Sequence, residues 1–385
     1  MQADSKPRVV VFSLAYEPQI GGAEVAIREL MSRIPEYDFY VIAGAHKSLA
    51  PRYEKRGTVH VFRVGRYTSW LGRLNHYLYV PLAALRAISL HRKNTFAFSW
   101  AIMAAYGGGA AYLFNRLKGV PILLNMQEGD PVAHIEKRVS IFRKFFLDFF
   151  KRVTRIQAIS TYLTGVAKHF GATAPMVVIP NGVDVARFNK RASLTELELL
   201  RASIVSASSA ICIFSASRLE EKNGVDTLIR ALVHDKRLEL VVAGEGSLRN
   251  ELEQLARELG VEERTHLIGS VPNDALPKYY HMADIFSRPS RSEGQGISFI
   301  EAFAAGVPVV GTDVDGISDF ARDGENMIVI KAQDDIAVAK ACVSIATNSS
   351  LRRTLIVGGL KTALLYGWDD IAPRMKKQFD LMISR

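Results

Sequence analysis

Short runs of apolar residues alternate with segments whose apolar positions recur at helical spacing along most of the chain. Continuous apolar runs, such as residues 8–14 and 210–217, are typical of strands that are covered on both faces. Similar runs occupy residues 39–43, 60–64, 96–100, 122–126, 155–159, 238–243, 265–269 and 307–310. Strands that alternate with helices in this way predict an α/β protein built on doubly wound parallel sheets.

The length and composition add the number of domains and the type of protein. With 385 residues, of which 48% are apolar and 23% charged, the chain is long enough for two globular domains with full cores. Cys212 and Cys342 both lie in apolar runs, which predicts buried thiols suited to a reducing cytosol. The N-terminal residues enter a strand without a signal-peptide core of adequate length. We therefore expect a cytoplasmic protein.

The charge balance points to an acidic partner. The formal net charge is +10, so nucleotide phosphates, an anionic lipid surface or a nucleic acid would be attracted. The sequence contains no recognisable nucleic-acid-binding motif, which leaves the first two partners. Four histidines stand singly, without the spacing of metal ligands, and no metal site is expected from them. They are His60, His76, His91 and His169.

The richest stretch for chemistry lies at residues 286–310, where a loop with two glycines precedes a helical pattern over residues 297–305. The loop consists of Glu293, Gly294, Gln295 and Gly296. Glycines let backbone N–H groups approach a ligand, and a helix start favours anionic groups. Glu293 and Glu301 are spaced to hold hydroxyls of one polyhydroxylated ligand. Alternatively, Glu293 caps the helix and Glu301 lies on its solvated face.

Two cations follow the predicted strand at residues 210–217. Arg218 and Lys222 are four residues apart and precede Gly224, after which a helix is predicted from about Val225. Arginine binds phosphate oxygens as a two-pronged fork and lysine as a point charge, so the pair suits a diphosphate. The alternative is that both are surface charges on a turn.

Two loops of the N-terminal half follow predicted strands in the same way. Gly21 and Gly22 precede a helical pattern at residues 23–33, which makes either a phosphate-binding corner or a plain connection between strand and helix. Gln127 begins a loop directly after the run at residues 122–126. Its amide can hold a sugar hydroxyl but cannot act as a general base. Asp130 and His134 are further contact candidates, or simply a turn residue and a helix-start residue.

Two segments bear on membranes. Residues 96–114 carry no charge and are long enough to span a bilayer, but a triple glycine would weaken a spanning helix, and we expect a strand, a turn and a helix. Residues 136–155 are strongly basic and carry an apolar stripe at helical spacing. The stripe consists of Phe142, Phe145, Phe146, Phe149 and Val153. This helix would either dock peripherally on the inner face of an anionic membrane or turn its stripe toward the core.

Taken together, these motifs resemble those of the retaining family-four glycosyltransferases of the GT-B type, also called glycosyl transferases group 1. Their pattern contains two glutamates separated by seven residues, an alanine-rich helix, a glycine and a Pro-Val strand, and Glu293 and Glu301 match both glutamates. The resemblance implies two Rossmann-like domains facing a central cleft. It implies an acceptor-binding domain at residues 1–187, a donor-binding domain at residues 188–368, and a final helix at residues 369–385 that packs back on the first domain.

The resemblance also assigns roles to residues. Arg218 and Lys222 would contact the donor diphosphate, Glu293 the donor sugar and Glu301 the ribose. The Gly21-Gly22 loop would lie over the diphosphate, Val271 would border the base, and Gly294, Gln295 and Gly296 would complete the donor site. Many relatives have a histidine where this chain has Gln127, so the acceptor-side chemistry stays open. Neither a metal nor a cofactor is implied, since the nucleotide sugar is itself a substrate.

The implied activity is the retaining transfer of a hexose from a UDP- or GDP-sugar to a saccharide or lipid-linked acceptor, in glycan or glycolipid biosynthesis. Two alternatives stay open. One is a nucleotide-sugar isomerase (an epimerase) of the same fold, which would turn over without an acceptor. The other is a non-catalytic, membrane-associated scaffold that binds nucleotide sugars.

Overall fold

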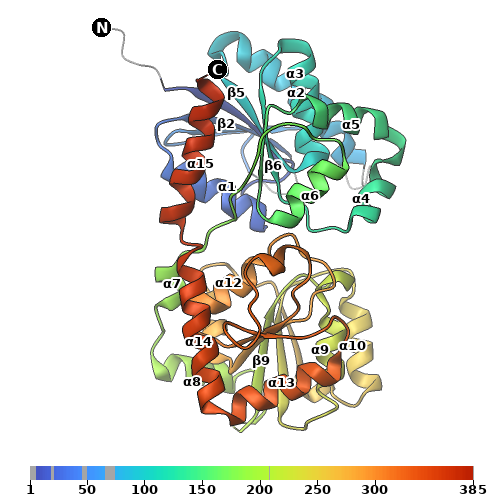
Figure 1. The fold of residues 1–385 in the computed structure, drawn as a ribbon, viewed down its shortest axis with the longest axis vertical. Helices are drawn as coiled ribbons and strands as arrows, with labels where there is room; N and C mark the ends of the chain where they lie inside the picture. Colours follow the sequence, from blue (N-terminus) through green and yellow to red (C-terminus); the bar gives the residue numbers. More distant parts are fainter. Residues whose placement is uncertain (1–5, 19–20, 46–49, 66–73, 208, 385) are drawn as a thin grey trace. The chain divides into compact units, whose positions relative to one another are not determined.

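The computed structural model describes residues 6–18, 21–45, 50–65, 74–207 and 209–384, and divides the chain into two compact units. The first unit consists of Met1–Asn181 together with Trp368–Arg385, and the second of Gly182–Gly367 (Figure 1). The boundary therefore lies at Gly182 rather than at residue 188. Phe188 belongs to the second unit, where its ring packs edge-on against that of Tyr280 in the core.

The first unit is built on an eight-stranded sheet in the order β3-β4-β2-β1-β5-β6-β7-β8. All neighbouring strands run parallel except β3 and β4. The strands are β1 (Arg8–Phe12), β2 (Asp38–Gly44), β3 (Tyr53–Arg56), β4 (Val59–Val64), β5 (Phe98–Ile102), β6 (Ile122–Met126), β7 (Arg155–Ala158) and β8 (Met176–Val178). The winding reverses between β1 and β5, which are parallel neighbours although three other strands lie between them in the chain.

Helices cover both faces of this sheet because its central strands are apolar on both sides. Helices α1 (Gly22–Arg33) and α15 (Trp368–Ile383) share one core and lie side by side in Figure 1. The other core is formed with α2 (Leu74–Asn94), α3 (Gly108–Lys118), α5 (Arg143–Arg152) and α6 (Thr161–His169). Phe379 of α15 packs against the rings of Tyr37 and Trp100, so the last helix returns to complete the first core.

The second unit is built on a six-stranded parallel sheet in the order β11-β10-β9-β12-β13-β14. Its strands are β9 (Ile211–Ala216), β10 (Leu238–Ala243), β11 (Thr265–Gly269), β12 (Ile285–Arg288), β13 (Val309–Gly311) and β14 (Ile328–Val329). The winding reverses between β9 and β12. In open α/β sheets, ligands bind outside the carboxyl ends of the strands at such a switch point.

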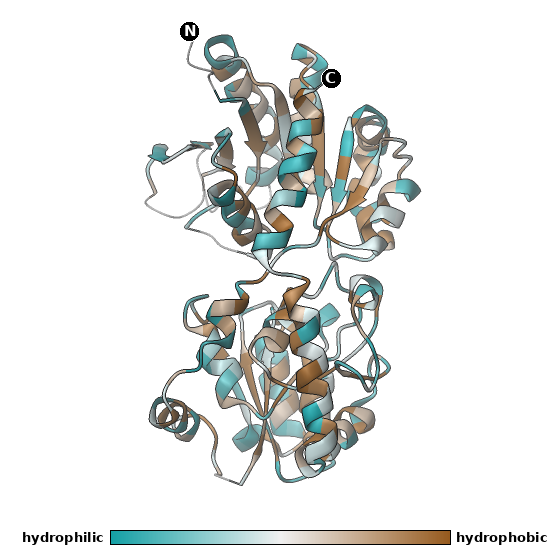
Figure 2. Cartoon of the chain, turned by 60° about the vertical axis from the view of Figure 1, so that its left-hand side comes forward, coloured by the Kyte–Doolittle hydropathy of each residue, from teal (hydrophilic) through white to brown (hydrophobic). Residues whose placement is uncertain are grey.

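Both faces of the second sheet are also covered. One core is formed with α7 (Val185–Asn189), α11 (Leu276–Met282) and α12 (Ile297–Ala304), and α8 (Leu194–Ala202) packs on α11. The opposite core is formed with α9 (Val225–Ala231), α10 (Arg249–Glu258) and α13 (Asp335–Thr347). Helix α14 (Ser349–Leu364) contributes to both. Figure 2 shows the strands of the two sheets largely in the brown of hydrophobic residues.

These observations confirm the predicted α/β class with two parallel-sheet, Rossmann-like domains. The predicted strand at residues 96–100 is shifted, since β5 spans Phe98–Ile102, and the chain continues through the π-helix η2 (Met103–Gly107) into α3. Within the described residues, no helix is long and apolar enough to cross a membrane. Both cysteines are buried as expected, and burial raises the pKa of each thiol to about 12.

The basic segment at residues 136–155 is not one helix. It is divided into α4 (Val132–Val139), the 3-10 helix η3 (Ser140–Phe142) and α5. Its apolar stripe is divided as well, because Phe149 and Val153 are buried in the core whereas Phe142 and Phe145 are exposed. Phe146 is partly buried against the same core. The core-facing interpretation therefore holds for Phe149 and Val153, and docking of the exposed residues on a membrane stays a prediction.

Candidate functional site

The two chemical motifs of the second unit meet at the switch point of its sheet. Strands β9 and β12 are parallel neighbours, with Ile213 opposite Ile285, so their carboxyl ends lie together. The loop after β9 carries Arg218 and Lys222, and the loop after β12 carries Glu293. A Cβ atom on Gly224 would lie 2.2 Å from a carbonyl oxygen of the β12 loop, so the two loops are in backbone contact. The sequence-predicted cations and carboxylates are thus brought to one edge.

The loop after β9 presents its cations outward. The Arg218 side chain is 66% exposed and its nearest carboxylate is Glu220, at 3.4 Å. Lys222 lies in the 3-10 helix η4 (Glu221–Asn223) and is partly buried. The buried Asn223 donates from Nδ2 to the Arg218 carbonyl oxygen at 2.6 Å, which fixes the backbone between the two cations. The Arg218 guanidinium is therefore accessible to an anionic ligand, on a loop that is itself held in place.

Glu293 does not cap a helix. Helix α12 begins after Gly296, whose φ of +86° is left-handed, and no side chain caps it. Instead, the Glu293 carboxylate forms an ion pair with Arg288 through Oε2 and accepts the N–H of Gly294 on Oε1 at 3.1 Å. The capping alternative is therefore wrong. Gln295, between the two glycines, is buried.

Arg288 is a site residue that sequence reasoning missed. Besides the ion pair with Glu293, its Nη2 donates to Asn223 Oδ1 at 2.5 Å and its Nη1 to Ser298 Oγ at 3.0 Å. Arg288 therefore connects the loop after β9, the loop after β12 and the first turn of α12. The available signal was an arginine at the end of strand β12, directly after three buried residues.

Glu301 lies on α12 against the second core rather than on a solvated face. Its Oε2 accepts the hydroxyl of the fully buried Tyr280 at 2.8 Å. Burial raises the pKa of Glu301 to about 7, and the hydrogen bond from Tyr280 and the charges of Arg187 and Arg288 oppose that rise. The solvated-face alternative is therefore wrong. Tyr280 is a second residue that the sequence analysis did not assign to the site.

Val271 lies apart from these residues but at the same end of the sheet. It follows β11, which is separated from β9 by β10, and its side chain packs on the second core. That Val271 borders a nucleotide base stays a prediction.

In the first unit, Gln127 follows β6 and is 9% exposed. Its Oε1 accepts the side-chain amide of Asn181 at 2.8 Å. Its Nε2 is buried and has no hydrogen-bond partner among the described residues. Asn181 therefore orients the Gln127 amide so that an N–H group is left for a ligand. The sequence analysis did not assign Asn181 to the site.

Glu128, next to Gln127, is a further residue that was not singled out. Its carboxylate accepts the backbone N–H of Ala104 and that of Gln127, the latter at 3.0 Å. Burial raises its pKa above the ordinary value. Met103, which opens η2, has a φ of +64°, an uncommon conformation for a residue with a side chain. The carboxyl ends of β5 and β6 thus carry a buried carboxyl group and a strained turn.

The other candidates of the first unit are less closely connected. Helix α1 begins at Gly22, and the N–H of Gly21 donates to the Glu24 carboxylate at 2.8 Å, so this amide is already occupied. Asp130 forms an ion pair with Arg138 at 3.3 Å. His134 is exposed on α4.

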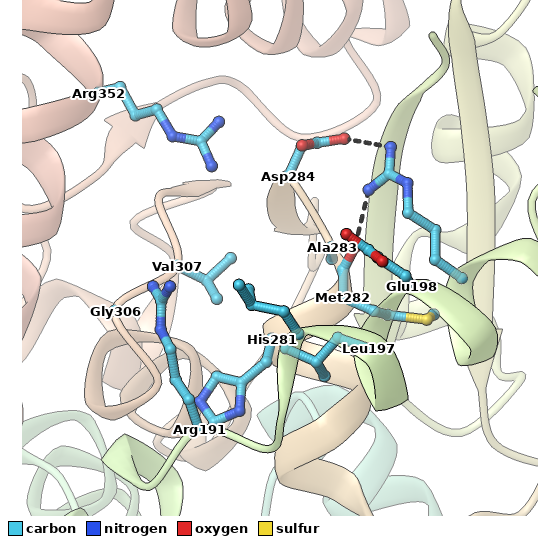
Figure 3. Close-up of a pocket in the computed structure, with 12 residues that line it drawn as sticks. Arg191, Leu197, Glu198, His281, Met282, Ala283, Asp284, Gly306, Val307 and Arg352 are labelled. Atoms are coloured by element: carbon cyan, nitrogen blue, oxygen red, sulfur yellow. Dashed lines mark hydrogen bonds and ion pairs between the residues drawn. The ribbon is translucent and has the colours of Figure 1, made fainter. Parts of the chain in front are cut away.

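A cavity of about 260 Å³ in the second unit lies at the amino ends of β12 and β13, beside Asp284 and Val307 (Figure 3). Arg201 donates to the Asp284 carboxylate there at 2.8 Å, and Arg191 and Arg352 extend toward the same space. Because Arg218, Lys222, Glu293 and Glu301 are not among its lining residues, this cavity is a separate feature of the unit.

Comparison with known families agrees with this geometry. The family model described as Glycosyl transferases group 1 matches residues 198–361, and the model described as Glycosyltransferase Family 4 matches residues 20–187. The chain belongs to glycosyltransferase family 4. The two matched ranges together cover most of this family-four chain and leave only its ends and a short middle segment outside.

Curated relatives include two enzymes whose names contain a lipid. The GDP-mannose-dependent alpha-(1-6)-phosphatidylinositol monomannoside mannosyltransferase of Mycobacterium tuberculosis is 28% identical over 221 residues, 54% of this chain and 57% of the relative. The alpha-monoglucosyldiacylglycerol synthase of Streptococcus pneumoniae is 23% identical over 90% of this chain and 80% of the relative. The chain spans about half the length of most curated relatives that it matches at higher identity.

A solved structure extends the comparison to nearly the whole chain. The sucrose-phosphate synthase of Thermosynechococcus elongatus superposes with a TM-score of 0.86 over 98% of this chain and 99% of that protein, at 17% identity. At this identity the likeness shows the fold alone, which is the GT-B fold of two Rossmann-like domains.

Proposed function

We propose that this chain is a retaining glycosyltransferase that moves a hexose from a nucleotide sugar to a lipid-linked acceptor. The observation that carries the proposal is the meeting of Arg218, Lys222, Glu293 and Glu301 at the β9–β12 switch point of a family-four chain. In the reaction, the bond between the anomeric carbon and the diphosphate oxygen breaks. An acceptor hydroxyl oxygen forms the new bond to carbon, and its proton passes to the leaving diphosphate.

Charge development in that step explains the two cations. As the bond breaks, negative charge grows on the leaving diphosphate, and groups aimed at developing charge lower the barrier. The exposed Arg218 guanidinium and Lys222 flank one fixed turn, which suits the two phosphates. These two cations stabilise the negative charge of the leaving diphosphate, so the proposal requires no metal ion.

The two carboxylates divide the rest of the donor. Glu293 lies in the loop next to the cations and would hold hydroxyls of the transferred sugar. Glu301 lies further along α12 and would accept hydrogen bonds from the ribose hydroxyls. Val271, which would border the base, packs against the same core as α12. Gln127, with its free buried amide nitrogen, would hold a hydroxyl on the acceptor side.

The lipid-linked acceptor is supported by an exposed apolar surface of the first unit, which we call the aromatic face. It consists of Tyr77, Leu78, Leu82 and Leu85 of α2 with Ile141, Phe142 and Phe145 of η3 and α5, all exposed large apolar residues. The rings of Tyr77 and Phe142, 6.2 Å apart, join the two parts. Exposed apolar patches with basic neighbours mark sites of membrane interaction.

The basic neighbours and a small cavity support the same interpretation. Lys137, Arg138, Arg143 and Lys144 are exposed on the same segment, and each basic side chain near an anionic surface adds about 1 kcal/mol, screened by salt. A cavity of about 40 Å³ at the carboxyl ends of β1, β2 and β4 is lined by Leu78 and Leu82 of the face. A lipid-linked saccharide held on the face would thus have its polar end near this edge. The names of the two curated relatives contain a lipid, as substrate in one and as product in the other, which agrees with such an acceptor.

Docking is tested by cosedimentation with vesicles of phosphatidylglycerol and phosphatidylcholine at low and high salt. Wild type should sediment with the vesicles and be only partly released by salt. The double variant Phe142→Ser/Phe145→Ser should lose the part that salt does not release. Leu364→Ser/Leu365→Ser removes two comparably exposed side chains of α14 and its end, and should behave as wild type. Wild type that stays in the supernatant under every condition would make a soluble acceptor the better proposal.

The activity is tested with labelled UDP-glucose, GDP-mannose and ADP-glucose, with and without a lipid extract. The proposal predicts acceptor-dependent release of nucleoside diphosphate and a labelled lipid whose anomeric configuration, determined by NMR, is that of the donor. Turnover of the sugar without any acceptor would support the isomerase instead. Binding of a nucleotide sugar without turnover under all conditions would support the scaffold.

A further inference from the structure

The Glu293 carboxylate is held by a cradle of side chains and backbone groups that family membership alone does not assign. We infer that Arg288 and Asp315 are positioning residues that fix Glu293 for the donor sugar, Arg288 at its carboxylate and Asp315 at its backbone. The inference rests on the proposed function, because it concerns the sugar-binding half of the same site.

Burial makes the Arg288–Glu293 pair more than a surface ion pair. The side chains are 11% and 16% exposed, so both charges have lost most of their water. A buried pair is stable only when further hydrogen bonds satisfy the remaining groups. Asn223 and Ser298 supply two of them for Arg288, whose Nε is buried without a partner among the described residues, and the Gly294 N–H supplies one for Glu293. One protein donor on each carboxylate oxygen fixes the group and leaves lone pairs for two sugar hydroxyls.

Asp315 secures the backbone on either side of Glu293. Its Oδ2 accepts the Glu293 N–H at 3.1 Å and the Ser292 hydroxyl at 2.7 Å. The next residue, Gly316, donates its N–H to the Glu293 carbonyl oxygen at 3.0 Å. A Cβ at Gly316 would lie 2.0 Å from the Gly294 carbonyl oxygen, so the two segments are in direct contact. The Glu293 peptide groups are thus clamped from both sides.

Asp315 makes these contacts from a strained conformation. Its φ of +49° is left-handed, a region that costs free energy for a residue with a side chain. Strain of this kind persists where surrounding contacts over-determine the backbone, and such residues gather at ligand sites. Asparagine tolerates this region and keeps an acceptor oxygen, whereas alanine loses both advantages.

Arg288 also connects the loop after β12, which carries Glu293, to the loop after β9, which carries Arg218. Arg288 Nη2 donates to Asn223 Oδ1, and Asn223 Nδ2 donates to the Arg218 carbonyl oxygen at 2.6 Å. A change at Arg288 would therefore disturb Glu293 directly and the Arg218 turn through one intermediate. The effect on the sugar should exceed the effect on the nucleotide.

Calorimetry separates these effects by comparing the bare nucleoside diphosphate with the nucleotide sugar that wild type binds most tightly. Arg288→Leu should keep nucleoside diphosphate affinity within about threefold and lower kcat by roughly 10²-fold, because small misplacements of a positioned group are costly. Arg288→Lys should recover part of the kcat, since it keeps the charge on Glu293. KM for the donor should change less than kcat.

Arg201→Leu is the matched control. Arg201 lies on α8, is similarly buried at 22% side-chain exposure, and pairs at 2.8 Å with Asp284, at the opposite end of β12, rather than with Glu293. It should lower the melting temperature about as much as Arg288→Leu but keep most of the turnover. Equal loss of turnover in the two variants would overturn the positioning role.

A double variant shows whether Arg288 acts through Glu293. Arg288→Leu/Glu293→Gln should be no slower than Glu293→Gln alone, because the group being positioned is already changed. Losses that multiply would overturn the inference. For the second positioning residue, Asp315→Asn should retain most of the turnover and Asp315→Ala should not. Equal turnover in these two variants would show that Asp315 does not position Glu293.

The outcome also distinguishes this inference from the proposed function. If wild type binds no nucleotide sugar, the proposed function and the inference both fail. If wild type binds and turns over a nucleotide sugar, and Arg288→Leu folds and does so equally well, only the inference fails.

Discussion

Both units are doubly wound, with eight strands in the first sheet and six in the second, but the loops that follow their strands are held differently. In the second unit, the loops at the β9–β12 edge are tied together by side-chain pairs, with Arg288 joining Asn223 to Glu293. In the first unit, Gln127 is held on one side by Asn181, and its other amide atom is buried without a partner in the described part of the chain. A shared topology therefore fixes where a ligand would bind in each unit, but the loop residues determine which ligand is bound.

The difference also suggests which half is preorganised. A site that stabilises a developing charge benefits from groups that need not move during the reaction. Glu293 of the second unit has that property, since Arg288 and the Gly294 N–H hold its carboxylate, and Asn223 holds the turn that carries Arg218. In the first unit, Asn181 holds the oxygen of the Gln127 amide, and a ligand would complete its nitrogen.

The largest effect is expected at the two cations of the second unit. Arg218→Ala or Lys222→Ala should lower kcat by about 10²-fold or more with the fold intact, because both stabilise the leaving diphosphate. Arg230→Ala, which removes an exposed arginine of α9, should leave turnover nearly unchanged. Steady-state kinetics and circular dichroism measure both. Near-normal turnover in both loop variants would remove the diphosphate assignment.

Substitutions of the two glutamates should affect different steps, nucleotide binding for Glu301 and sugar transfer for Glu293. Glu301→Ala should weaken binding of the bare nucleoside diphosphate by roughly tenfold or more, as expected when hydrogen bonds to a charged group are lost. Glu293→Ala should leave that affinity nearly unchanged and reduce transfer, because its partner is the sugar. Calorimetry with the bare nucleotide measures the difference. Equal losses in the two variants would contradict the division of the donor between them.

The sequence predicted the fold and half of the site for identifiable reasons. Apolar runs and helical spacing report burial locally, and the motif pairs Arg218–Lys222 and Glu293–Glu301 are local in the chain. Arg288 and Tyr280 were not predicted as site residues, because no local pattern shows hydrogen bonds between distant positions. Arg288 donates to Asn223, 65 positions away, and Tyr280 donates to Glu301, 21 positions away. The division of residues 136–155 into three helices was missed because periodicity continues across the break.

A smaller effect is expected from pH. Burial raises the pKa of Glu301 from 4.5 to about 7, and ribose hydroxyls would bind the ionised form. Nucleoside diphosphate affinity should therefore fall below about pH 7, by up to tenfold per pH unit. The phosphate itself titrates near pH 6. Glu301→Gln is the control, because titration of the ligand's phosphate affects its nucleotide affinity in the same way. If nucleotide affinity depended on pH identically in the two proteins, the role of this carboxyl would be refuted.

The same shift has a consequence for stability without a ligand. The folded chain binds the Glu301 proton more tightly than the unfolded chain, so this group's contribution is fully present below about pH 4.5 and is lost as pH rises through about 7. From pH 5 to pH 8, the free energy of unfolding measured in urea should decrease more for wild type than for Glu301→Gln. Parallel curves would mean that the carboxyl titrates normally.

The smallest effect is expected in the first unit. Asn181→Ala removes one neutral hydrogen bond that orients Gln127, which is worth about 1 kcal/mol, so transfer should slow by roughly threefold to tenfold. Nucleoside diphosphate affinity should not change, because the nucleotide is assigned to the other unit. Asn115→Ala removes a comparable bond to the Val120 carbonyl oxygen and serves as the control. A change in nucleotide affinity in Asn181→Ala would place the nucleotide near Gln127 instead.

The most direct test of the difference between the units is a crystal structure with a bound nucleoside diphosphate. The account predicts density at the β9–β12 edge, with diphosphate oxygens on Arg218 and Lys222 and ribose hydroxyls within hydrogen-bond distance of Glu301. Nucleotide bound only by the first unit, or in the cavity beside Arg191 and Arg352 (Figure 3), would contradict it.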